Sequence, residues 1–300
     1  MLSNILSRHE FWNRLKNHPQ AIVDYEHLRH NYLNSYFLPE DSDAKYRAAL
    51  KKQSLFRNIC TVIPGPKTDS TVYVSDEEDE VEWMTPETNL TEHTDVFDKI
   101  ALPAHVLSVL TKLDEDMIHD AQFDLESHLI NRFSKSFANG EENAFINGDG
   151  DNKPYGILDD AQGADIGYTT AVIGYEDVVK LYFSVKKEYR RRGCWLMNDV
   201  TAFALRKLQD PSGSYIWNHN SDTLLGKPVY ISDYMPDPEQ GKKPIAFGDF
   251  SRFWIVDRLP LSVRVLEELF VAYGHVGFIG HEYLNGILVT PEAIKVLKVV

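Results

Sequence analysis

The sequence of 300 residues contains few cysteines and no long hydrophobic run. Its two cysteines, Cys60 and Cys194, match neither a CxxC motif nor the spacing of a metal site, so we predict two buried free thiols. No stretch approaches the ~18–20 apolar residues of a membrane span, and the N-terminus lacks the apolar core of a signal peptide. These absences predict a soluble protein that is made in a cytoplasm and does not enter a membrane.

Basic residues are the second deficit. Lysine and arginine number 31 against 45 aspartates and glutamates, and the formal net charge is −14. Such an acidic surface repels phosphate, which argues against a general nucleic-acid binder and against docking on anionic membranes. This charge is compatible with a protein that encloses DNA without binding it tightly. The one basic cluster, three arginines at residues 190–192, could touch DNA or an acidic neighbour, or could serve solubility alone.

Catalytic and ligand-binding motifs are also missing. To bind calcium, the loop that starts at Asn147 would need Gly and Glu at its sixth and twelfth positions, where it has Asn152 and Leu158. His275 and His281 would share one face of a strand, but a metal site needs a third ligand. No phosphate loop or nucleophile elbow occurs. We therefore predict no catalytic residue, no metal and no cofactor, although catalytic groups can converge from distant segments.

A stripe of apolar residues predicts one long helix over residues 118–146. Its members follow spacings of three or four, which places them on one helical face. At about 1.5 Å per residue the helix would be roughly 40 Å long, with Gly140 inside it. Asn139 and Gly140 could instead end a first helix, which would leave two helices. The stripe comprises Ile118, Ala121, Leu125, Leu129, Phe133 and Phe137.

The second half of the chain mixes helices and strands without strict alternation, which indicates an α+β fold and not a doubly wound sheet. Amphipathic spacing predicts helices over residues 175–189 and 200–208. Runs of β-branched and aromatic residues predict strands at residues 194–197, 227–231, 245–247, 253–256, 262–266 and 270–278.

Two segments of the first half lack the apolar surface to fold alone. Residues 1–58 are helical in pattern, and we expect them to form an arm that lies along other surfaces. Residues 70–95 are predicted to form a long hairpin with an acidic end, and no Lys or Arg lies between Lys67 and Lys99. Such a hairpin needs support from another chain, unless its acids are only a solvated face. The residues at this end are Asp76, Glu77, Glu78, Asp79, Glu80 and Glu82, followed by Trp83.

The turn after the predicted long helix carries a signature. Residues 145–150 and 153–158 read FINGDG and KPYGIL, and they resemble the "spine helix, GDG, KPxGI" pattern of the major capsid proteins of tailed bacteriophages and prophages, which have the Hong Kong 97 fold. The residues of this motif are Asn147, Gly148, Asp149, Gly150, Pro154 and Gly156. Later segments resemble the same family in the same order, namely WLMN at 195–198, LRKLQD at 205–210, LLGKPVY at 224–230 and IAFGDF at 245–250.

The resemblance implies a chain divided into four parts. In such shells the subunits form pentamers and hexamers, and the arm and the extended loop overlap neighbouring subunits. The acidic residues 76–82 and Trp83 would then make contacts between subunits. The parts are an N-terminal arm at 1–58, an extended loop at 66–96, a peripheral domain with the spine helix at 97–159 and 251–300, and an axial domain at 160–250.

The function that the resemblance implies is structural. The chain would self-assemble into the icosahedral head of a tailed phage or prophage and enclose the genome without sequence-specific DNA binding. Its expected partners are further copies of itself, a portal, and a scaffold or protease during assembly. It would be made in the bacterial host cytoplasm and reside in the virion capsid. Two alternatives stay open, an encapsulin-type cargo compartment with the same fold and a soluble enzyme with a composite acidic site.

Covalent reinforcement is a further property of some members of this family. These relatives form a lysine–asparagine isopeptide bond between the extended loop of one subunit and the peripheral domain of another. Here the loop has no lysine between Lys67 and Lys99, and residues 270–276, where the asparagine would fall, contain none. Asn285 is expected beyond them in a separate turn. The resemblance therefore implies a shell without these bonds.

Overall fold

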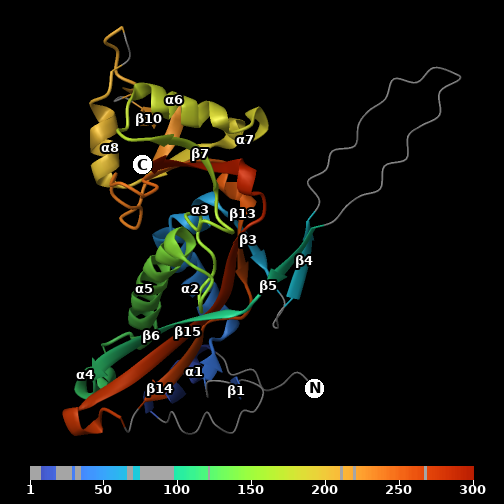
Figure 1. Ribbon diagram of the computed structural model, residues 1–300. Helices are drawn as coiled ribbons and strands as arrows, with labels where there is room; N and C mark the ends of the chain where they lie inside the picture. The colour runs from blue at the N-terminus through green and yellow to red at the C-terminus, as the bar shows by residue number, and fades with distance from the viewer. Residues whose placement is uncertain are drawn as a thin grey trace, which may run out of the picture.

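The computed structural model contains two seven-stranded sheets, with a long helix, α5 (Leu125–Asn147), that starts beside the first sheet and ends towards the second (Figure 1). The fold is α+β, as predicted. The structure describes residues 8–17, 29–30, 35–65, 70–74, 98–120, 122–209, 212–218, 221–266 and 269–300.

The first sheet is built around one long strand, β15 (His275–Leu288). Along one edge β15 pairs antiparallel with β14 and then β13, and along the other it pairs antiparallel with β6 over ten residue positions. The remaining strands follow in the order β1-β2-β14 on one flank and β13-β3 on the other. Their bounds are β1 (Arg29–His30), β2 (Ser35–Phe37), β3 (Thr61–Pro64), β6 (His105–Asp114), β13 (Phe253–Asp257) and β14 (Ser262–Leu266).

Strand β15 differs from the strand predicted at residues 270–278. It begins five residues later and continues ten residues further, so Asn285 lies within the strand, opposite Val256, and not in a separate turn. The glycines explain the difference, because they weaken the sequence pattern of a strand but allow close packing here. A Cβ at Gly280 would press on Phe133 and Phe137, and a Cβ at Gly286 would press on Phe145.

Helix α5 covers one face of this sheet with its apolar stripe. Leu129, Phe133, Phe137 and Phe145 are at most 1% exposed, and the first three belong to one core with residues of β14 and β15. Gly140 lies inside the helix, as predicted, where a Cβ would face the side chain of Leu107 on β6. No chain reversal occurs at this glycine.

The helix starts later than predicted, so residues 118–146 are not one helix. A short helix, α4 (Glu115–His119), is followed by a break, and α5 begins at Leu125. The cause is an N-cap: Asp124 accepts hydrogen bonds from the backbone N–H of Ser127 at 3.1 Å and from its hydroxyl at 2.6 Å. α5 therefore has 23 residues, about 35 Å in length.

The second sheet has the strand order β7-β16-β12-β8-β11-β10-β9. Its strands β8 and β12, which were both predicted as strands, are buried at every position. β16 pairs parallel with β7 and antiparallel with β12, so it lies between segments far apart in the sequence. The bounds are β7 (Asp165–Thr170), β8 (Cys194–Met197), β9 (Trp217–Asn218), β10 (Thr223–Leu224), β11 (Lys227–Ile231), β12 (Ile245–Gly248) and β16 (Ile294–Val299).

Three helices accompany the second sheet, α6 (Tyr175–Ser184), α7 (Lys187–Arg192) and α8 (Asp199–Arg206) (Figure 1). The single helix predicted over residues 175–189 is divided into α6 and α7. The division lies at Val185, which adopts an extended conformation and is 1% exposed, because its side chain enters the core of this sheet. The predicted helix at 200–208 is confirmed as α8.

The N-terminal helices pack on the body of the same chain. They are α1 (Arg8–Asn17), α2 (Glu40–Gln53) and α3 (Phe56–Ile59). α1 buries Phe11 and Leu15, and α2 places Tyr46 edge-on against Phe137 of α5 with ring centroids 6.2 Å apart. These helices are amphipathic and rely on α5 and the first sheet for their apolar contacts.

A separate two-stranded sheet lies to the side of the body (Figure 1). It consists of β4 (Ser70–Val74) and β5 (Asp98–Leu102), which pair antiparallel with Ser70 opposite Leu102. The two strands thus have the arrangement expected for the base of the predicted hairpin. The acidic residues 76–82 and Trp83 lie outside the described residues.

Candidate functional site

The glycine-rich motif forms the turn that follows α5, and the chain then returns along the last turn of that helix. A helix leaves its last carbonyl groups without intrahelical partners, and this return segment supplies partners. The backbone N–H groups of Gly156, Ile157 and Leu158 donate to the carbonyl oxygens of Gly148, Phe145 and Ile146 at 2.9, 2.8 and 3.1 Å.

Space at this turn admits only glycine at two positions. A Cβ at Gly148 would collide with the backbone carbonyl of Pro154, and a Cβ at Gly156 would collide with the carbonyl of Ile146. Gly150 has a φ of +80°, a conformation that favours glycine. The six motif residues are therefore brought together by close backbone packing, with Pro154 buried in the turn.

The polar residues of the motif bond to neighbouring backbone. Asn147 donates from Nδ2 to the carbonyl oxygen of Tyr234 at 2.8 Å, which ties the end of α5 to the segment after β11. Asp149 accepts from the backbone N–H of Asp151 at 3.1 Å and lies 3.2 Å from the ammonium of Lys153. The backbone hydrogen bond from Asp151 lowers the pKa of Asp149. The motif thus connects α5 to the second sheet.

Sequence reasoning missed a buried ionic cluster between α3, α5 and the first sheet. It contains Arg57, Glu141, Asp257 and Glu282, which come from four elements. One signal was present: Glu141 follows Phe137 by four residues, so a charged residue occupies the apolar stripe of the predicted helix. The other members are far apart in sequence and share no motif.

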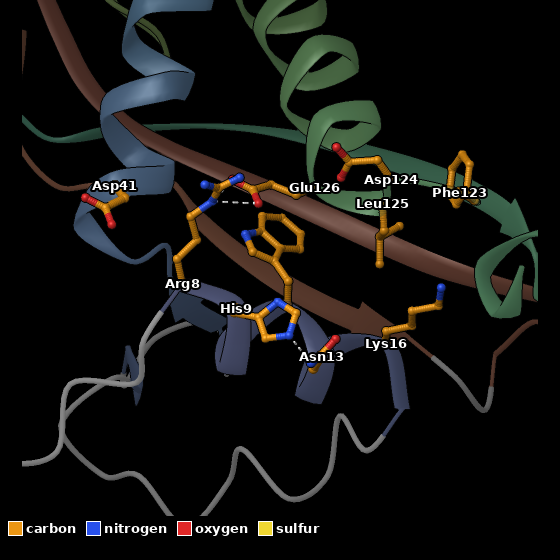
Figure 2. A pocket seen from close by; sticks show the side chains of 10 residues that line it. Arg8, His9, Asn13, Lys16, Asp41, Phe123, Asp124, Leu125 and Glu126 are labelled. Atoms are coloured by element: carbon orange, nitrogen blue, oxygen red, sulfur yellow. Dashed lines mark hydrogen bonds and ion pairs between the residues drawn. The ribbon is translucent and has the colours of Figure 1, made fainter. Parts of the chain in front are cut away.

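A pocket of about 620 Å³ lies between α1, the start of α2 and the start of α5 (Figure 2). Its charged side chains hold these helices together. Arg8 on α1 donates from Nε to both carboxylate oxygens of Glu126 on α5, at 2.7 and 2.8 Å (Figure 2). Lys16 donates to the carbonyl oxygen of Asp120 at 2.9 Å. The contacts that line this pocket therefore attach α1 to α5 and to the segment before α5.

The thiols are not activated for chemistry. Both cysteines are free; Cys194 is buried and Cys60 is half-buried. Burial raises the pKa of Cys194 to about 12, so its reactive thiolate form is scarce at neutral pH. Within the described part of the chain, no group of three or more His, Cys, Asp or Glu is placed to hold a metal. Among the helices described, none is long and apolar enough to cross a membrane.

The outer faces of the helices on the second sheet expose apolar rings. Phe183 of α6 is 64% exposed and Phe203 of α8 is 62% exposed. Basic side chains lie beside them: the Arg190 guanidinium is 4.9 Å from the centroid of the Phe183 ring, and the Lys207 ammonium is 3.7 Å from that of Phe203. Exposed aromatic surface bordered by charge is typical of contacts with other protein surfaces.

Comparisons with known proteins identify relatives of this arrangement. Residues 34–299 match the model of the phage capsid family. A search of curated proteins finds no match. Among solved structures, the capsid of an empty GTA particle, computed with C5 symmetry, is 33% identical with a TM-score of 0.71, covering 83% of this chain and 90% of that chain. The capsid of a native GTA particle is 32% identical with a TM-score of 0.65, covering 82% and 89%.

A phage protein shows the same fold at low identity. The structure from Mycobacterium phage Bobi is 14% identical with a TM-score of 0.55, and 99% of each chain is covered. The observed architecture is therefore the Hong Kong 97-type capsid fold. The chain belongs to the phage capsid family, and it is a structural protein of the capsid shell.

Proposed function

We propose that this chain is the major subunit of the icosahedral head of a tailed phage or prophage, assembled as pentamers and hexamers around DNA. The observation that carries the proposal is the match of residues 34–299 to the phage capsid family, together with 33% identity to a GTA capsid protein over most of both chains. The exposed rings of Phe183 and Phe203 supply apolar surface that a neighbouring copy would cover.

In this proposal the parts of the chain have different roles. Residues 1–58 are the arm and residues 66–96 the extended loop, and both overlap neighbouring subunits, although the helices of the arm also pack on the body of their own chain. Residues 97–159 and 251–300 form the peripheral domain, and residues 160–250 form the axial domain. The antiparallel pair of β4 and β5 lies to the side of the body, and it supports a hairpin whose first strand lies in the loop and whose second strand begins at Asp98, just after the loop (Figure 1). The acidic residues 76–82 and Trp83 would contact the next subunit.

The remaining partners follow from the same role. The subunit is made in the host cytoplasm and meets a portal and a scaffold or protease during assembly. It encloses DNA without recognising its sequence, and its net charge of −14 supports weak binding of the DNA phosphates. It performs no catalysis. An encapsulin-type compartment is not favoured, because the matching family is that of phage capsids.

The test is to image the concentrated, purified full chain by negative-stain electron microscopy and to measure its sedimentation. We expect closed shells, or pentamers and hexamers, at a size far above one subunit. A small, monodisperse species at all concentrations would contradict the proposal. The neighbouring genes distinguish the remaining alternative: a portal, a protease and a terminase accompany a phage head, whereas a peroxidase-like cargo would accompany a compartment.

A further inference from the structure

One arginine side chain lies inside the molecule among three carboxyl groups. Arg57 of α3 is 5% exposed at its side chain. Its guanidinium binds Glu141 of α5 through Nε and Nη2, with Nε 2.8 Å from Oε2. It also donates from Nη1 and Nη2 to the two oxygens of Asp257 on β13, each at 2.9 Å. The third carboxyl, Glu282 of β15, has one oxygen 3.3 Å from Nη2.

A second arginine closes the cluster toward the surface. Arg47 of α2 is 42% exposed at its side chain, and it donates to Asp43 at 2.7 Å and to Asp257 at 3.0 Å. Asp43 is also bound on its other side, because its Oδ1 accepts the backbone N–H of Leu261 at 3.1 Å. Arg47 therefore balances charge at the outer end of the cluster, and Arg57 is the cation at its buried end.

Glu282 is the carboxyl group of this cluster whose negative charge has the fewest neutralising contacts. Its only ion pair is the single contact with Arg57, and its Oε2 is buried without a hydrogen-bond partner among the described residues. The buried hydroxyl of Tyr46 faces this carboxyl and is a potential hydrogen-bond donor to it. If every group were ionised, four carboxylates would face two guanidinium groups, a net charge of −2. Burying unbalanced charge is costly, and a buried carboxyl avoids the cost by keeping its proton.

We propose that this cluster is a proton-binding site, in which a proton at neutral pH resides on Glu282, the carboxyl with the fewest contacts to Arg57. Burial also raises the pKa of Glu141, but the charge of Arg57 and its hydrogen bonds oppose that shift. Burial, followed by the charge of Glu141, raises the pKa of Glu282 well above that of an ordinary glutamate, in agreement with this geometry. The charged and titratable groups around Glu282 are Asp43, Tyr46 and Arg47 of α2, Arg57 of α3, Glu141 of α5 and Asp257 of β13.

The site couples pH to the attachment of the N-terminal helices. Arg57 lies on α3 and Tyr46 on α2, whereas Glu141 and Glu282 lie on α5 and β15. Loss of the proton from Glu282 adds a charge between these elements and weakens their contact. Because the folded-state pKa of Glu282 is raised, its contribution to stability is fully present below the pKa of an unfolded glutamate, about 4.3, and is lost as pH rises through the folded-state pKa.

The direct test is infrared spectroscopy of the full chain at neutral pH, with Glu282→Gln as the variant. A protonated carboxylic acid has a C=O stretching band that carboxylates and amides lack, and this band shifts in heavy water. We expect the wild-type band to be missing in Glu282→Gln and retained in the matched control Glu188→Gln, which changes an exposed glutamate of α7. Identical spectra in this region for wild type and Glu282→Gln would overturn the proposal.

A second readout is the melting temperature as a function of pH, on the same subunits or particles. Wild type and Glu188→Gln should lose stability as the pH rises from about 4.3 through neutral into the alkaline range. Glu282→Gln should lose measurably less, because its neutral amide cannot ionise. Glutamine has the shape of protonated glutamic acid, so the variant should fold. A Glu282→Gln chain that fails to fold, or that has the same alkaline decline as wild type, would count against the proposal. Neither readout depends on shell assembly, so failure of the proposed function would be seen separately.

Discussion

At the scale of single residues, the turn after α5 shows how far a motif can be interpreted. The sequence identified Asn147, Gly148 and Gly156 as members of a signature, but it did not indicate why glycine is needed. The reason is three-dimensional: the backbone of residues 154–158 passes so close to the last turn of α5 that no Cβ fits at Gly148 or Gly156. Arg57 and Glu282 could not be predicted as partners, because only the packing of α3 on β15 brings them together.

Replacing Gly156 with alanine tests this explanation. The new Cβ would collide with the backbone carbonyl of Ile146, which cannot move without disturbing the end of α5, so we expect a loss of about 1–3 kcal/mol in the free energy of unfolding. Chemical denaturation of the subunit measures the change. Gly174→Ala is the control, because Gly174 precedes α6 with room for a Cβ, and it should cost less, about 0.5–1 kcal/mol, from the preference for Gly over Ala at a helix N-cap. Equal effects of the two substitutions would refute the steric explanation.

At the scale of elements, the spacing of apolar residues in the sequence predicted the position of most helices and strands but not their ends. The stripe that includes Leu129 and Phe133 predicted the buried face of α5, yet Ile118 shares that spacing while belonging to α4. The helix boundary depends on the side chain of Asp124. This side chain accepts the N–H of Ser127 and so begins a new helix there, where the apolar stripe alone predicts that one helix continues. Strand β15 was predicted too short because the close contact that its glycines allow with α5 is not visible in the sequence.

The N-cap of α5 gives a prediction with a pH dependence. Asp124→Ala should lower the free energy of unfolding by about 1 kcal/mol, whereas Asp124→Asn, which can still accept the bond from Ser127, should lower it less. Hydrogen bonds from Ser127 lower the pKa of Asp124, so its contribution is present above the pKa of an unfolded aspartate, about 3.9, and is lost as pH falls through the folded-state pKa. Denaturation at neutral and acidic pH measures this. An Asp124→Ala deficit that stays constant into acid would contradict the role of the carboxylate.

The acidic run in the extended loop gives a prediction about assembly. Replacing Glu77, Glu78, Asp79 and Glu80 with Gln or Asn should leave the subunit folded and change the salt dependence of assembly, because like charges at a contact repel unless a neighbour or cations relieve them. Light scattering against salt concentration measures assembly, and circular dichroism checks folding. The control replaces Glu115, Asp116, Glu188 and Glu239 in the same way, which are four exposed acids outside the arm and the loop. If assembly and its salt response are unchanged, the run is only a solvated face.

At the scale of the whole molecule, the family resemblance predicted the architecture, and the residues alone predicted only its class. The mixture of helices and strands without strict alternation favoured α+β, but the pairing of β16 with β7 and β12 joins segments that no local pattern connects. Long-range pairings of this kind need tertiary information. The exposed rings of Phe183 and Phe203 were likewise not predictable, because each lies in a helix whose other face is buried.

We predict that the assembled shell is held by non-covalent contacts. The loop has no lysine between Lys67 and Lys99, and Asn285 is 2% exposed within β15, where it cannot reach a lysine of a neighbour. Area burial and ion pairs summed over many contacts would then hold the shell. Boiled, reduced particles on a denaturing gel should give a single band at the 34.4 kDa monomer. A ladder of multimers that resists boiling and reductant would show that covalent bonds are present.

The position of β16 has a consequence for synthesis on the ribosome. Asp165 of β7 and Lys295 of β16 form an ion pair at 2.6 Å across 130 residues of sequence, and β16 separates β7 from the rest of its sheet. At about 5–20 residues per second, the ribosome needs roughly 6 to 26 seconds between these two residues. During that interval β7 has no strand to pair with, and β12, once it has been made, keeps one edge unpaired. The nascent chain therefore passes through a state in which two strand edges stay open until β16 has been made, and an open edge can pair with another chain.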